Sequence, residues 1–501
     1  MPEKRLSKSV VALILVLFVI LANYVIIRAF FLVVTPFPLA EKLFGLLFFG
    51  AEGFVLLHGF GYFSNMLSNY RRFRPPAVKA YEEEPSVAVL VPARHEPYDV
   101  LYSTMLSCVN LSYGNKRVYL LDDSSIASYK EEARAIAEEL GVELFVRPDN
   151  RGAKAGMLNE VLATLDATYI VVFDADQNPM PGFLGSMVPI MEGDSRLALV
   201  QTPQFYSNTA VSRVAWSSMV QQAVFYEYIC EGKSAKGAMF CCGTNFIMRR
   251  EALVSVGGFE EGTVTEDVAT TFKLHLSGWK TLYHERAYTF GMAPEDLGSY
   301  FTQQNRWALG SAQLLRKLLS SFLHKPSALS FLQWFEYFLS GSYYFIGWAY
   351  MILLSAPVLY IFTSVPSYFM EPLYFAVFYI PYFLLSVFLF YFGLGQRNYR
   401  TRHLVLAQML AMLAAPVYMQ AVVQGFFNRK KPFQVTPKGG ARAIPYRLLS
   451  VQLLLWMVHL SAFTWGMMRL VLEQDIGVAL NVFWVGFHFM LFSSLFYFNK
   501  E

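Results

Sequence analysis

The chain has 501 residues, of which 55% are hydrophobic and 16% are charged, with a net charge of +4. Soluble globular proteins carry about 25% charged residues. This composition excludes a disordered chain, a collagen-like fibre and a small disulfide-stabilised scaffold, and it disfavours a wholly soluble protein. The small net charge gives no support to nucleic-acid binding. Several membrane-spanning helices of about 20 residues each would account for the apolar excess and leave enough chain for one large soluble domain.

Apolar segments long enough to cross a bilayer lie toward both ends of the chain. The first two cover residues 10–34 and 43–66. After a long region of mixed polarity, further segments follow at residues 331–362, 373–394, 448–472 and 476–498. Six spans are therefore predicted. The segment 404–427 is also apolar but contains Pro416 and three glutamines, so it is predicted to form a pair of interfacial helices and not a seventh span.

Lysine and arginine residues lie on one side of these predicted spans. They precede the first span, follow the second at Arg71 and recur throughout residues 397–447, whereas the opposite short loops contain Lys42 alone. The positive-inside rule then places both termini and the soluble region in the cytoplasm, in a multi-pass protein of the plasma membrane. The expected regions are two N-terminal membrane helices (1–70), a cytoplasmic domain with interfacial helices (71–325), two membrane helices (326–396), an interfacial region (397–445) and two C-terminal membrane helices (446–501).

The cytoplasmic region alternates short β-branched segments with helical patterns. Strands are predicted at residues 87–91, 118–121, 143–146, 169–173 and 197–201, and helices at residues 129–140, 153–164 and 181–191. This order predicts an α/β domain with a doubly wound, mostly parallel sheet, in which ligands bind beyond the carboxyl ends of the strands. The sequence has neither G-x-G-x-x-G nor a P-loop, so neither kind of nucleotide site is predicted.

Pairs of aspartates follow two of the predicted strands. Asp122 and Asp123 end the second strand, and Asp174 and Asp176 follow the fourth. Residues two apart in an extended chain point the same way, so Asp174 and Asp176 can face one ligand. Two carboxylates at one place repel each other unless a cation lies between them, and Mg²⁺ or Mn²⁺ shared with substrate phosphates is the simplest solution. D-x-D alone is a common loop pattern, so its position after an apolar strand is what points to a metal.

A Thr-Glu-Asp sequence at residues 265–267 precedes a predicted helix that runs to Leu276. Thr265 has the character of an N-cap, with Glu266 and Asp267 in the first turn. Good capping alone would explain these residues. We also expect the helix dipole to keep Asp267 ionised, which suits a base that must be deprotonated.

The sequence Gln-Gln-Asn-Arg-Trp at residues 303–307 lies on an amphipathic stretch that leads toward the next span. Arg306 offers fixed charge and bidentate hydrogen-bond donors for a pyrophosphate. Trp307 offers a flat apolar face on which a sugar ring can stack. Anchoring of a helix at the membrane surface is the alternative role for both residues.

Two glutamates, Glu52 and Glu336, lie inside or near apolar segments. A buried carboxylate in a membrane is costly. Each is therefore expected either to have a partner on a neighbouring helix or to be functional, and the sequence does not decide between these interpretations.

Taken together, these residues resemble the signatures of family 2 inverting glycosyltransferases, which are a spaced Asp, DxD, TED and QxxRW. The matching residues, in order, are Asp122-Asp123, Asp174-Ala175-Asp176, Thr265-Glu266-Asp267 and Gln303-x-x-Arg306-Trp307. Residues 153–156, 201–204 and 242–245 are also similar to that family. The sequence FQVTPKG at residues 433–439 resembles the FxVTxK gating loop of cellulose synthases. The resemblance implies a GT-A type fold for the α/β domain, inserted between the membrane helices.

The resemblance further implies a processive β-glucan synthase that extends a polysaccharide from a UDP-sugar, with UDP-glucose favoured, and passes it through its own membrane channel. Donor binding is implied for Glu96, Asp122, Asp123, Lys154, Asp174, Arg306, Thr436 and Lys438. Binding of Mg²⁺ or Mn²⁺ is implied for Asp176, and catalysis for Asp267 as the base with Glu266 beside it. Contact with the growing polysaccharide is implied for Trp307, Gln303, Gln201 and Asn245.

Three alternatives stay open. A chitin-like or hyaluronan-like synthase would use another UDP-sugar, and a non-processive enzyme would transfer one sugar to a lipid acceptor. A transporter or channel with a degenerate cytoplasmic domain would have no need of the acidic residues, which are intact. The linkage, 1,4 or 1,3, depends on which acceptor hydroxyl faces Asp267.

Overall fold

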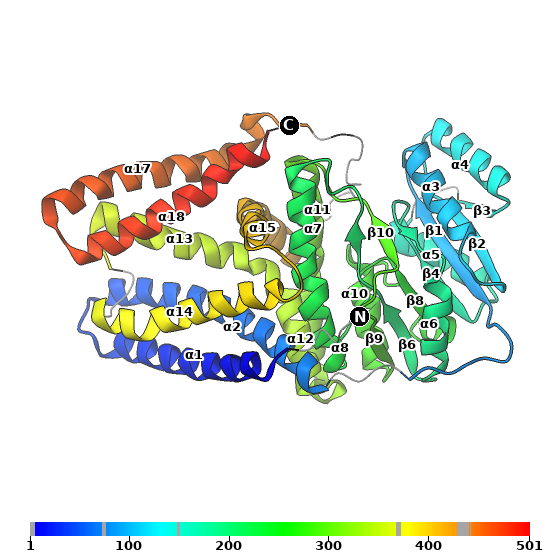
Figure 1. Ribbon diagram of the computed structural model, residues 1–501, viewed down its shortest axis with the longest axis horizontal. Coiled ribbons are helices and arrows are strands. Elements are labelled where there is room, and N and C mark those ends of the chain that lie inside the picture. Colours follow the sequence, from blue (N-terminus) through cyan, green and yellow to red (C-terminus); the bar gives the residue numbers. More distant parts are fainter. Residues whose placement is uncertain are drawn as a thin grey trace.

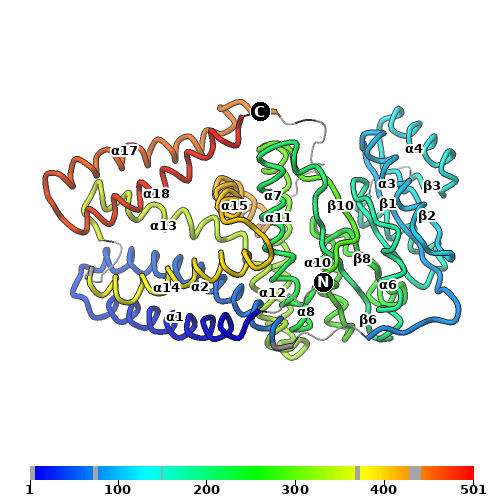
Figure 2. The backbone as a smooth tube through the Cα atoms, in the orientation of Figure 1, coloured from blue at the N-terminus to red at the C-terminus, as the bar shows by residue number. Residues whose placement is uncertain are grey.

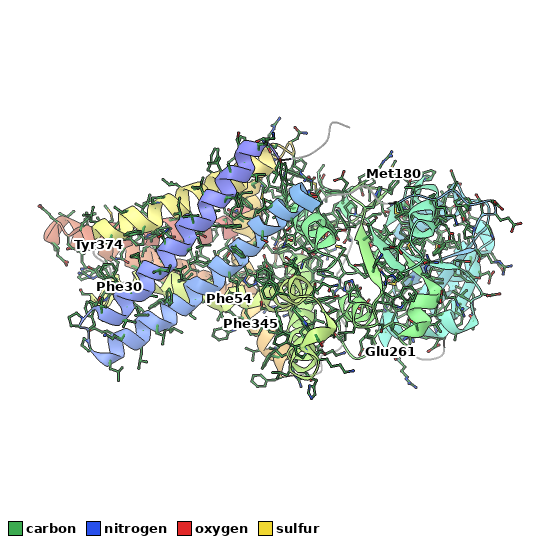
Figure 3. The ribbon with its side chains drawn as sticks, turned by 90° about the horizontal axis from the view of Figure 1, so that it is seen from below. Phe30, Phe54, Met180, Glu261, Phe345 and Tyr374 are labelled. Atoms are coloured by element: carbon green, nitrogen blue, oxygen red, sulfur yellow. The ribbon has the colours of Figure 1, made fainter. Side chains whose placement is uncertain are left out.

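The computed structural model describes residues 6–72, 77–147, 151–366, 372–427, 440 and 442–500. These residues form a bundle of long helices and an α/β domain that lie side by side (Figure 1). The first described helix belongs to the bundle, and the chain then builds the α/β domain and returns to the bundle (Figure 2). Phe30 and Tyr374 lie toward the end of the bundle far from the domain, whereas Met180 and Glu261 lie in the domain (Figure 3). The predicted α/β domain between membrane helices is confirmed.

Six helical segments in the described part of the chain are long and apolar enough to cross a membrane. They are α1 (Lys8–Val34), α2 (Leu39–Arg72), α12 (Phe331–Ser342) continued by α13 (Ile346–Thr363), α14 (Pro372–Gly395), α17 (Ser450–Glu473) and α18 (Ile476–Phe498). In α1 the buried side chains recur at helical spacing, at Val10, Ile14, Leu17 and Tyr24, because one face of the helix packs against α2 and α14. The six predicted spans are therefore present as helices.

The apolar segment before the last two spans forms a bent pair of short helices. These are α15 (Thr401–Leu413) and α16 (Ala415–Phe426), which meet at an angle of 49°. Pro416 explains the break, because proline has no N–H to continue the hydrogen-bond ladder of α15. The predicted helix pair is thus present, and it would add a seventh span only if both helices together crossed the membrane.

The α/β domain is built on a seven-stranded sheet with the strand order β3-β2-β1-β4-β8-β6-β9. Its strands are β1 (Val87–Ala93), β2 (Lys116–Asp122), β3 (Glu143–Val146), β4 (Tyr169–Val172), β6 (Leu197–Gln201), β8 (Phe246–Arg249) and β9 (Lys280–Tyr283). Among these strands only β8 runs antiparallel to its neighbours, so the predicted mostly parallel sheet is confirmed. β8 and β9 are not among the predicted strands, although they are no shorter than β3 and β4, which are. A smaller sheet joins β5 (Asn178–Pro179), β10 (Thr289–Gly291) and β7 (Phe205–Tyr206).

Helices cover both faces of the large sheet. Along β1 the side chains alternate, so that Val87, Val89 and Val91 face one side and Ala88 and Leu90 the other. The first face packs against α3 (Tyr98–Val109), α4 (Ala127–Leu140) and α6 (Phe183–Glu192), and the second against α5 (Ala153–Thr164). Burial on both faces explains why β1 is apolar throughout instead of alternating with polar residues.

The remaining helices follow strands of the domain, and most of them contact the bundle. They are α7 (Arg213–Val224), a π-helical turn (Phe225–Cys230), α8 (Glu231–Ala235), α9 (Arg250–Ser255), α10 (Glu266–Leu276) and α11 (Leu297–His324). α11 lies between the domain and the bundle (Figure 1) and packs closely on α16. A Cβ atom on Gly425 would lie 2.3 Å from the backbone oxygen of Leu309, so this close approach requires glycine.

Both glutamates of the apolar segments are buried and have partners on other elements. Glu336 of α12 is 1% exposed and lies 2.9 Å from Lys233 Nζ and 2.6 Å from Lys236 Nζ, at the end of α8. Glu52 of α2 lies 3.5 Å from Arg28 Nε of α1. The first group joins the domain to the bundle, and the second joins two helices within it.

Candidate active site

The aspartates that follow β2 and β4 lie at one edge of the sheet. β1 pairs in parallel with both strands, so the carboxyl ends of the three strands meet there. Asp122 ends β2 in register with Ala93, the last residue of β1. Asp174 follows β4 closely in the chain. The edge predicted to bind a ligand is therefore the place where these carboxylates gather.

Asp123 is paired with an arginine. It accepts two hydrogen bonds from Arg147, at 2.9 Å from Nε and 3.0 Å from Nη2. Arg147 also donates to the backbone oxygens of Arg151 and Ala153, at 2.6 Å and 2.8 Å, and so holds the start of α5 in place. Sequence reasoning misses Arg147, although its position directly after β3 at the same edge of the sheet is a signal that could have found it.

One carboxylate oxygen of Asp122 is available to accept a hydrogen bond. Its Oδ1 accepts a hydrogen bond from the Ser124 N–H at 3.0 Å, whereas its Oδ2 is buried with no hydrogen-bond partner among the described residues. The loop after β1 is held beside it by the His95 N–H, which donates to Ser124 Oγ at 3.1 Å. Glu96 is the next residue of this loop and is half-buried. A buried carboxylate oxygen without a donor is suited to accept an N–H from a ligand.

Lys154 lies in the first turn of α5 and reaches toward β4 and the segment before β8. Its Nζ donates to Asp174 Oδ1 at 2.5 Å and to the Gly243 oxygen at 2.7 Å. Burial alone would lower the pKa of Lys154, but attraction by Asp174, Glu266 and Asp267 outweighs it and the pKa is raised. Lys154 is therefore a permanent positive charge among three carboxylates.

Glu266 and Asp267 form the first turn of α10. Burial, with the Glu266 carboxylate as the next cause, raises the pKa of Asp267 to about 7. The sequence predicts that the helix dipole keeps Asp267 ionised. This prediction is wrong, because desolvation and the like charge of the neighbouring carboxylate raise the pKa by more than the dipole lowers it. Thr265 is at the N-cap, as predicted, but its side chain makes no capping hydrogen bond. A carboxylate with a pKa near neutrality is well matched to general base catalysis.

The middle of α11 reaches the same group of charges. Tyr206 of β7 lies within hydrogen-bonding reach of Gln303 and close to the charges of Asp176 and Arg306. Burial raises the pKa of Glu266, and Arg306 is near enough to Glu266 to oppose that effect. The tertiary structure thus brings together the D-x-D, Thr-Glu-Asp and Gln-x-x-Arg-Trp sequences, as their resemblance to one family implies.

Contacts along α11 place Trp307 between the charged site and the bundle. On one side of the helix, Gly310 lies against Thr265 at the start of α10. On another side, Gln304 accepts a hydrogen bond from the Tyr418 hydroxyl of α16 at 3.1 Å. Trp307 follows Gln304 by three residues and precedes Gly310 by three, so it lies on the strip of helix surface between these two contacts.

Gln201 and Asn245 are fully buried beside the segment that precedes β8, and both are 0% exposed. Gln201 Nε2 donates to the Thr244 oxygen at 2.8 Å, and its Oε1 accepts from the Cys242 N–H at 2.8 Å. Asn245 Nδ2 donates to Gln177 Oε1 at 3.0 Å. These bonds hold the segment that precedes β8. The predicted contact of both residues with an acceptor gains no support from this burial.

Thr436 and Lys438 lie outside the described residues, together with the sequence that resembles a gating loop. Gly440, the first described residue after them, donates its N–H to Glu295 Oε2 at 2.8 Å, close to the start of α11. The predicted closure of this segment over a nucleotide therefore stays a prediction.

The carboxylates at the sheet edge are of the chemical type that binds divalent cations. Among the described residues, no group of three His, Cys, Asp or Glu side chains is arranged to hold a metal ion. Carboxylate oxygens are the donors that Mg²⁺ and Mn²⁺ prefer, and substrate phosphates commonly complete their coordination. Asp174 forms an ion pair with Lys154, and the binding of a metal by Asp176 stays a prediction.

Comparison with known families agrees with this geometry. Residues 85–310 match the family described as glycosyltransferase like family 2, and residues 252–397 match the cellulose synthase family. The chain contains a family 2 glycosyltransferase domain. The cellulose synthase match begins within this glycosyltransferase domain and continues through α14 of the bundle.

Curated proteins that are similar to most of this chain are named as cellulose synthases. "Putative cellulose synthase 2" of Komagataeibacter xylinus is 31% identical over 405 residues, which are 79% of this chain and 26% of the relative. The cellulose synthase 1 catalytic subunit (UDP-forming) of the same organism is 30% identical over 400 residues, 78% of this chain and 52% of the relative. The catalytic subunit (UDP-forming) of Pseudomonas fluorescens (strain SBW25) is 28% identical over 432 residues, 82% of this chain and 56% of the relative. The chain thus spans from about a quarter to just over half of the length of these relatives.

A solved structure shares the fold. A mannosyltransferase from Pyrobaculum calidifontis, in complex with GDP-Man and Mn²⁺, has a TM-score of 0.52 to this chain and is 18% identical to it. The similarity covers 76% of this chain and 99% of the mannosyltransferase. The GT-A type of the glycosyltransferase domain, implied by its sequence motifs, is thereby confirmed.

Proposed function

We propose that this chain is a membrane-embedded inverting glycosyltransferase that polymerises UDP-glucose into a β-linked glucan and passes the polymer across the membrane. The observation that carries the proposal is the convergence of Asp174, Asp267 and Arg306 on one sheet edge, beside a helix that packs on the apolar bundle. The UDP-forming cellulose synthase subunits among the relatives support UDP-glucose as the donor and a β-glucan as the product. The distribution of Lys and Arg supports a cytoplasmic site.

The donor is bound at the ends of the parallel strands. Asp122, with its unsatisfied buried oxygen, and Glu96 hold the uridine, while Lys154 and Arg306 face the diphosphate. Arg306 and Lys154 stabilise the negative charge that develops on the departing UDP, because fixed donors aimed at developing charge lower the barrier. A divalent cation, Mg²⁺ or Mn²⁺, held by Asp176 and the phosphate oxygens, would supply further neutralisation of the diphosphate.

Asp267 acts as the general base. It removes the proton from the acceptor hydroxyl as the hydroxyl oxygen attacks the anomeric carbon from the face opposite the diphosphate. The bond between the anomeric carbon and the diphosphate oxygen breaks, and UDP leaves with its electron pair. An α-linked donor therefore yields a β-linked product. Burial, together with the neighbouring Glu266 carboxylate, keeps the pKa of Asp267 high enough for the base to accept a proton at neutral pH. Trp307 stacks on the terminal sugar of the chain.

The proposal is tested with the purified full chain in nanodiscs, supplied with UDP-glucose and Mg²⁺ or Mn²⁺. Release of UDP and a long β-glucan are the expected products. Because a divalent cation is proposed to neutralise the diphosphate beside the carboxylates, EDTA is expected to reduce UDP release to background, and excess Mn²⁺ to restore it.

Product analysis separates the alternatives. A single sugar attached to a lipid would contradict processive synthesis, and polymer formed only from UDP-N-acetylglucosamine or UDP-glucuronate would replace UDP-glucose as the donor. Full UDP release in the presence of EDTA would contradict the role of a divalent cation. Linkage analysis of the polymer then distinguishes 1,4 from 1,3 bonds.

Gly243 controls the position of the proposed base. Its φ is +86°, and a Cβ atom there would lie 3.0 Å from Asp267 Oδ2. We expect Gly243→Ala to displace this carboxylate and to lower kcat roughly 10- to 100-fold, with UDP affinity retained. Gly185→Ala is the matched control, because a Cβ there meets nothing within 4 Å. Unchanged kcat in Gly243→Ala would show that the carboxylate does not need this position.

A further inference from the structure

A cavity separate from the proposed active site lies where the glycosyltransferase domain meets the end of the last span. Its volume is about 510 Å³, and none of the residues assigned to donor or acceptor lines it. Its walls come from the start of α7, the residues just before α11, the first turns of α15 and the C-terminal end of α18. That end of α18 lies close to α7 and α11 (Figures 1 and 2). The cavity is thus at the level where the bundle ends and the domain begins.

Basic side chains dominate the charge of this cavity. Arg213, Arg402, Arg442 and Lys500 line it, and all four are exposed. Arg213 donates to the backbone oxygen of Tyr497 at 2.9 Å. Arg402, Arg442 and Lys500 form no ion pair with any carboxylate in the part of the chain that the structure describes. Their charges are therefore available to a ligand.

Two carboxylates share the cavity, but other donors already engage them. Glu295 accepts hydrogen bonds from Asn208 Nδ2 at 3.1 Å and from the Gly440 N–H at 2.8 Å. Asp296 caps α11 by accepting from the Ser299 N–H at 2.8 Å. With four basic and two acidic side chains, the cavity carries a positive charge that an anion would balance.

The rest of the lining includes an unused donor and apolar side chains. The ring of Trp216 lies edge-on to His403, with 5.0 Å between their centroids. The indole N–H of Trp216 is buried and has no acceptor among the described residues. Leu406 and Phe498 add apolar surface at the end of the bundle. An occupant that suits this lining has both acceptor oxygens and an apolar part.

We propose that this cavity binds the headgroup of an anionic phospholipid. Guanidinium groups match phosphate oxygens in a bidentate manner, and basic pockets on the cytoplasmic side of membrane helices are well suited to anionic headgroups. The apolar side chains beside α18 favour a lipid over a soluble phosphate, because acyl chains can then lie along the bundle. The inference rests on the proposed membrane setting and not on the proposed reaction.

The test is a lipid titration of the purified full chain in detergent, followed by native mass spectrometry. The probes are palmitoyl-oleoyl-phosphatidylglycerol (POPG) and its zwitterionic phosphatidylcholine counterpart (POPC). The chain is expected to retain one POPG more tightly than POPC. Each basic residue near an anionic headgroup contributes a factor of about five in affinity, so R402Q/R442Q should bind POPG roughly 25-fold more weakly. R402K/R442K keeps both charges and should retain most of the affinity.

Two comparisons make the outcome decisive. Lys325→Gln removes one charge from an exposed residue before α12, outside the cavity, and should leave POPG retention unchanged. Glycerol 3-phosphate should fail to displace POPG, and its success at an equal concentration would overturn the lipid assignment in favour of a soluble phosphate. Equal retention of POPG and POPC, or unaltered POPG affinity in folded R402Q/R442Q, would also overturn the proposal.

Discussion

An Asp267→Asn variant is expected to lose roughly 100- to 10,000-fold in kcat with UDP-glucose, because an amide cannot take the proton from the acceptor hydroxyl. UDP release under saturating donor measures this loss. Affinity for UDP should change little, since Asp267 acts on the acceptor and not on the nucleotide. Asp194→Asn is the matched control, because Asp194 lies in an ion pair with Lys280 that takes no part in the proposed reaction.

The pH dependence of the parent chain tests the same assignment independently. Asp267 must be deprotonated to act as a base, and its pKa is raised to about 7 by burial and by Glu266. The rate should therefore fall about tenfold per pH unit below pH 7 and level off above it. Full turnover by Asp267→Asn, or a rate that is flat between pH 5 and 8, would remove Asp267 from the role of base.

A Glu336→Gln variant is expected to destabilise the junction between domain and bundle by roughly 3–5 kcal/mol, because it leaves two buried ammonium groups without a counter-charge. Lys233 donates to Glu336 Oε2 at 2.9 Å and to Ser340 Oγ at 2.7 Å, and Lys236 donates to Glu336 Oε1 at 2.6 Å and to Asn65 Oδ1 at 3.0 Å. Three elements, α2, α8 and α12, therefore depend on one carboxylate. The loss is measured as a lower Tm in detergent, followed by size-exclusion chromatography after heating.

Two further variants identify the cause of that loss. Glu251→Gln removes a carboxylate from an exposed site and should leave the Tm unchanged. Replacing Glu336, Lys233 and Lys236 together by methionine should recover most of the stability, because a buried ion group can be exchanged for apolar side chains of similar volume. A Tm in Glu336→Gln equal to that of the parent chain would show that the two lysines find other partners.

Much of the local structure could be predicted from the sequence. The strand Glu143–Val146, the helix Ala153–Thr164 and the strand Leu197–Gln201 have the bounds that their residue patterns predict. The six apolar helices and the break at Pro416 likewise follow from short-range composition. These features depend on hydrophobic periodicity and on residues near in sequence, which the chain carries regardless of its tertiary contacts. The order of the acidic motifs was also enough to indicate the family of the domain.

The chemical state and the neighbours of the same residues depend on contacts between distant parts of the chain. Sequence predicts a helix dipole acting on Asp267, but the tertiary structure buries that carboxylate beside Glu266, and the pKa rises because desolvation is the larger effect. The structure likewise pairs Asp123 with Arg147 and leaves Asp122 with a free oxygen, a difference that two adjacent aspartates do not reveal.

The buried glutamates and the basic cavity also separate what the sequence determines from what the tertiary structure determines. The sequence by itself determined that Glu336 lies near an apolar segment and that basic residues cluster on one side of the spans. Only the tertiary structure decided that Lys233 and Lys236 enclose that glutamate and that Arg402 and Arg442 line one cavity. The physical reason is that periodicity records which side chains leave water, whereas the electrostatic partner of a charge is set by segments that fold against it from elsewhere in the chain.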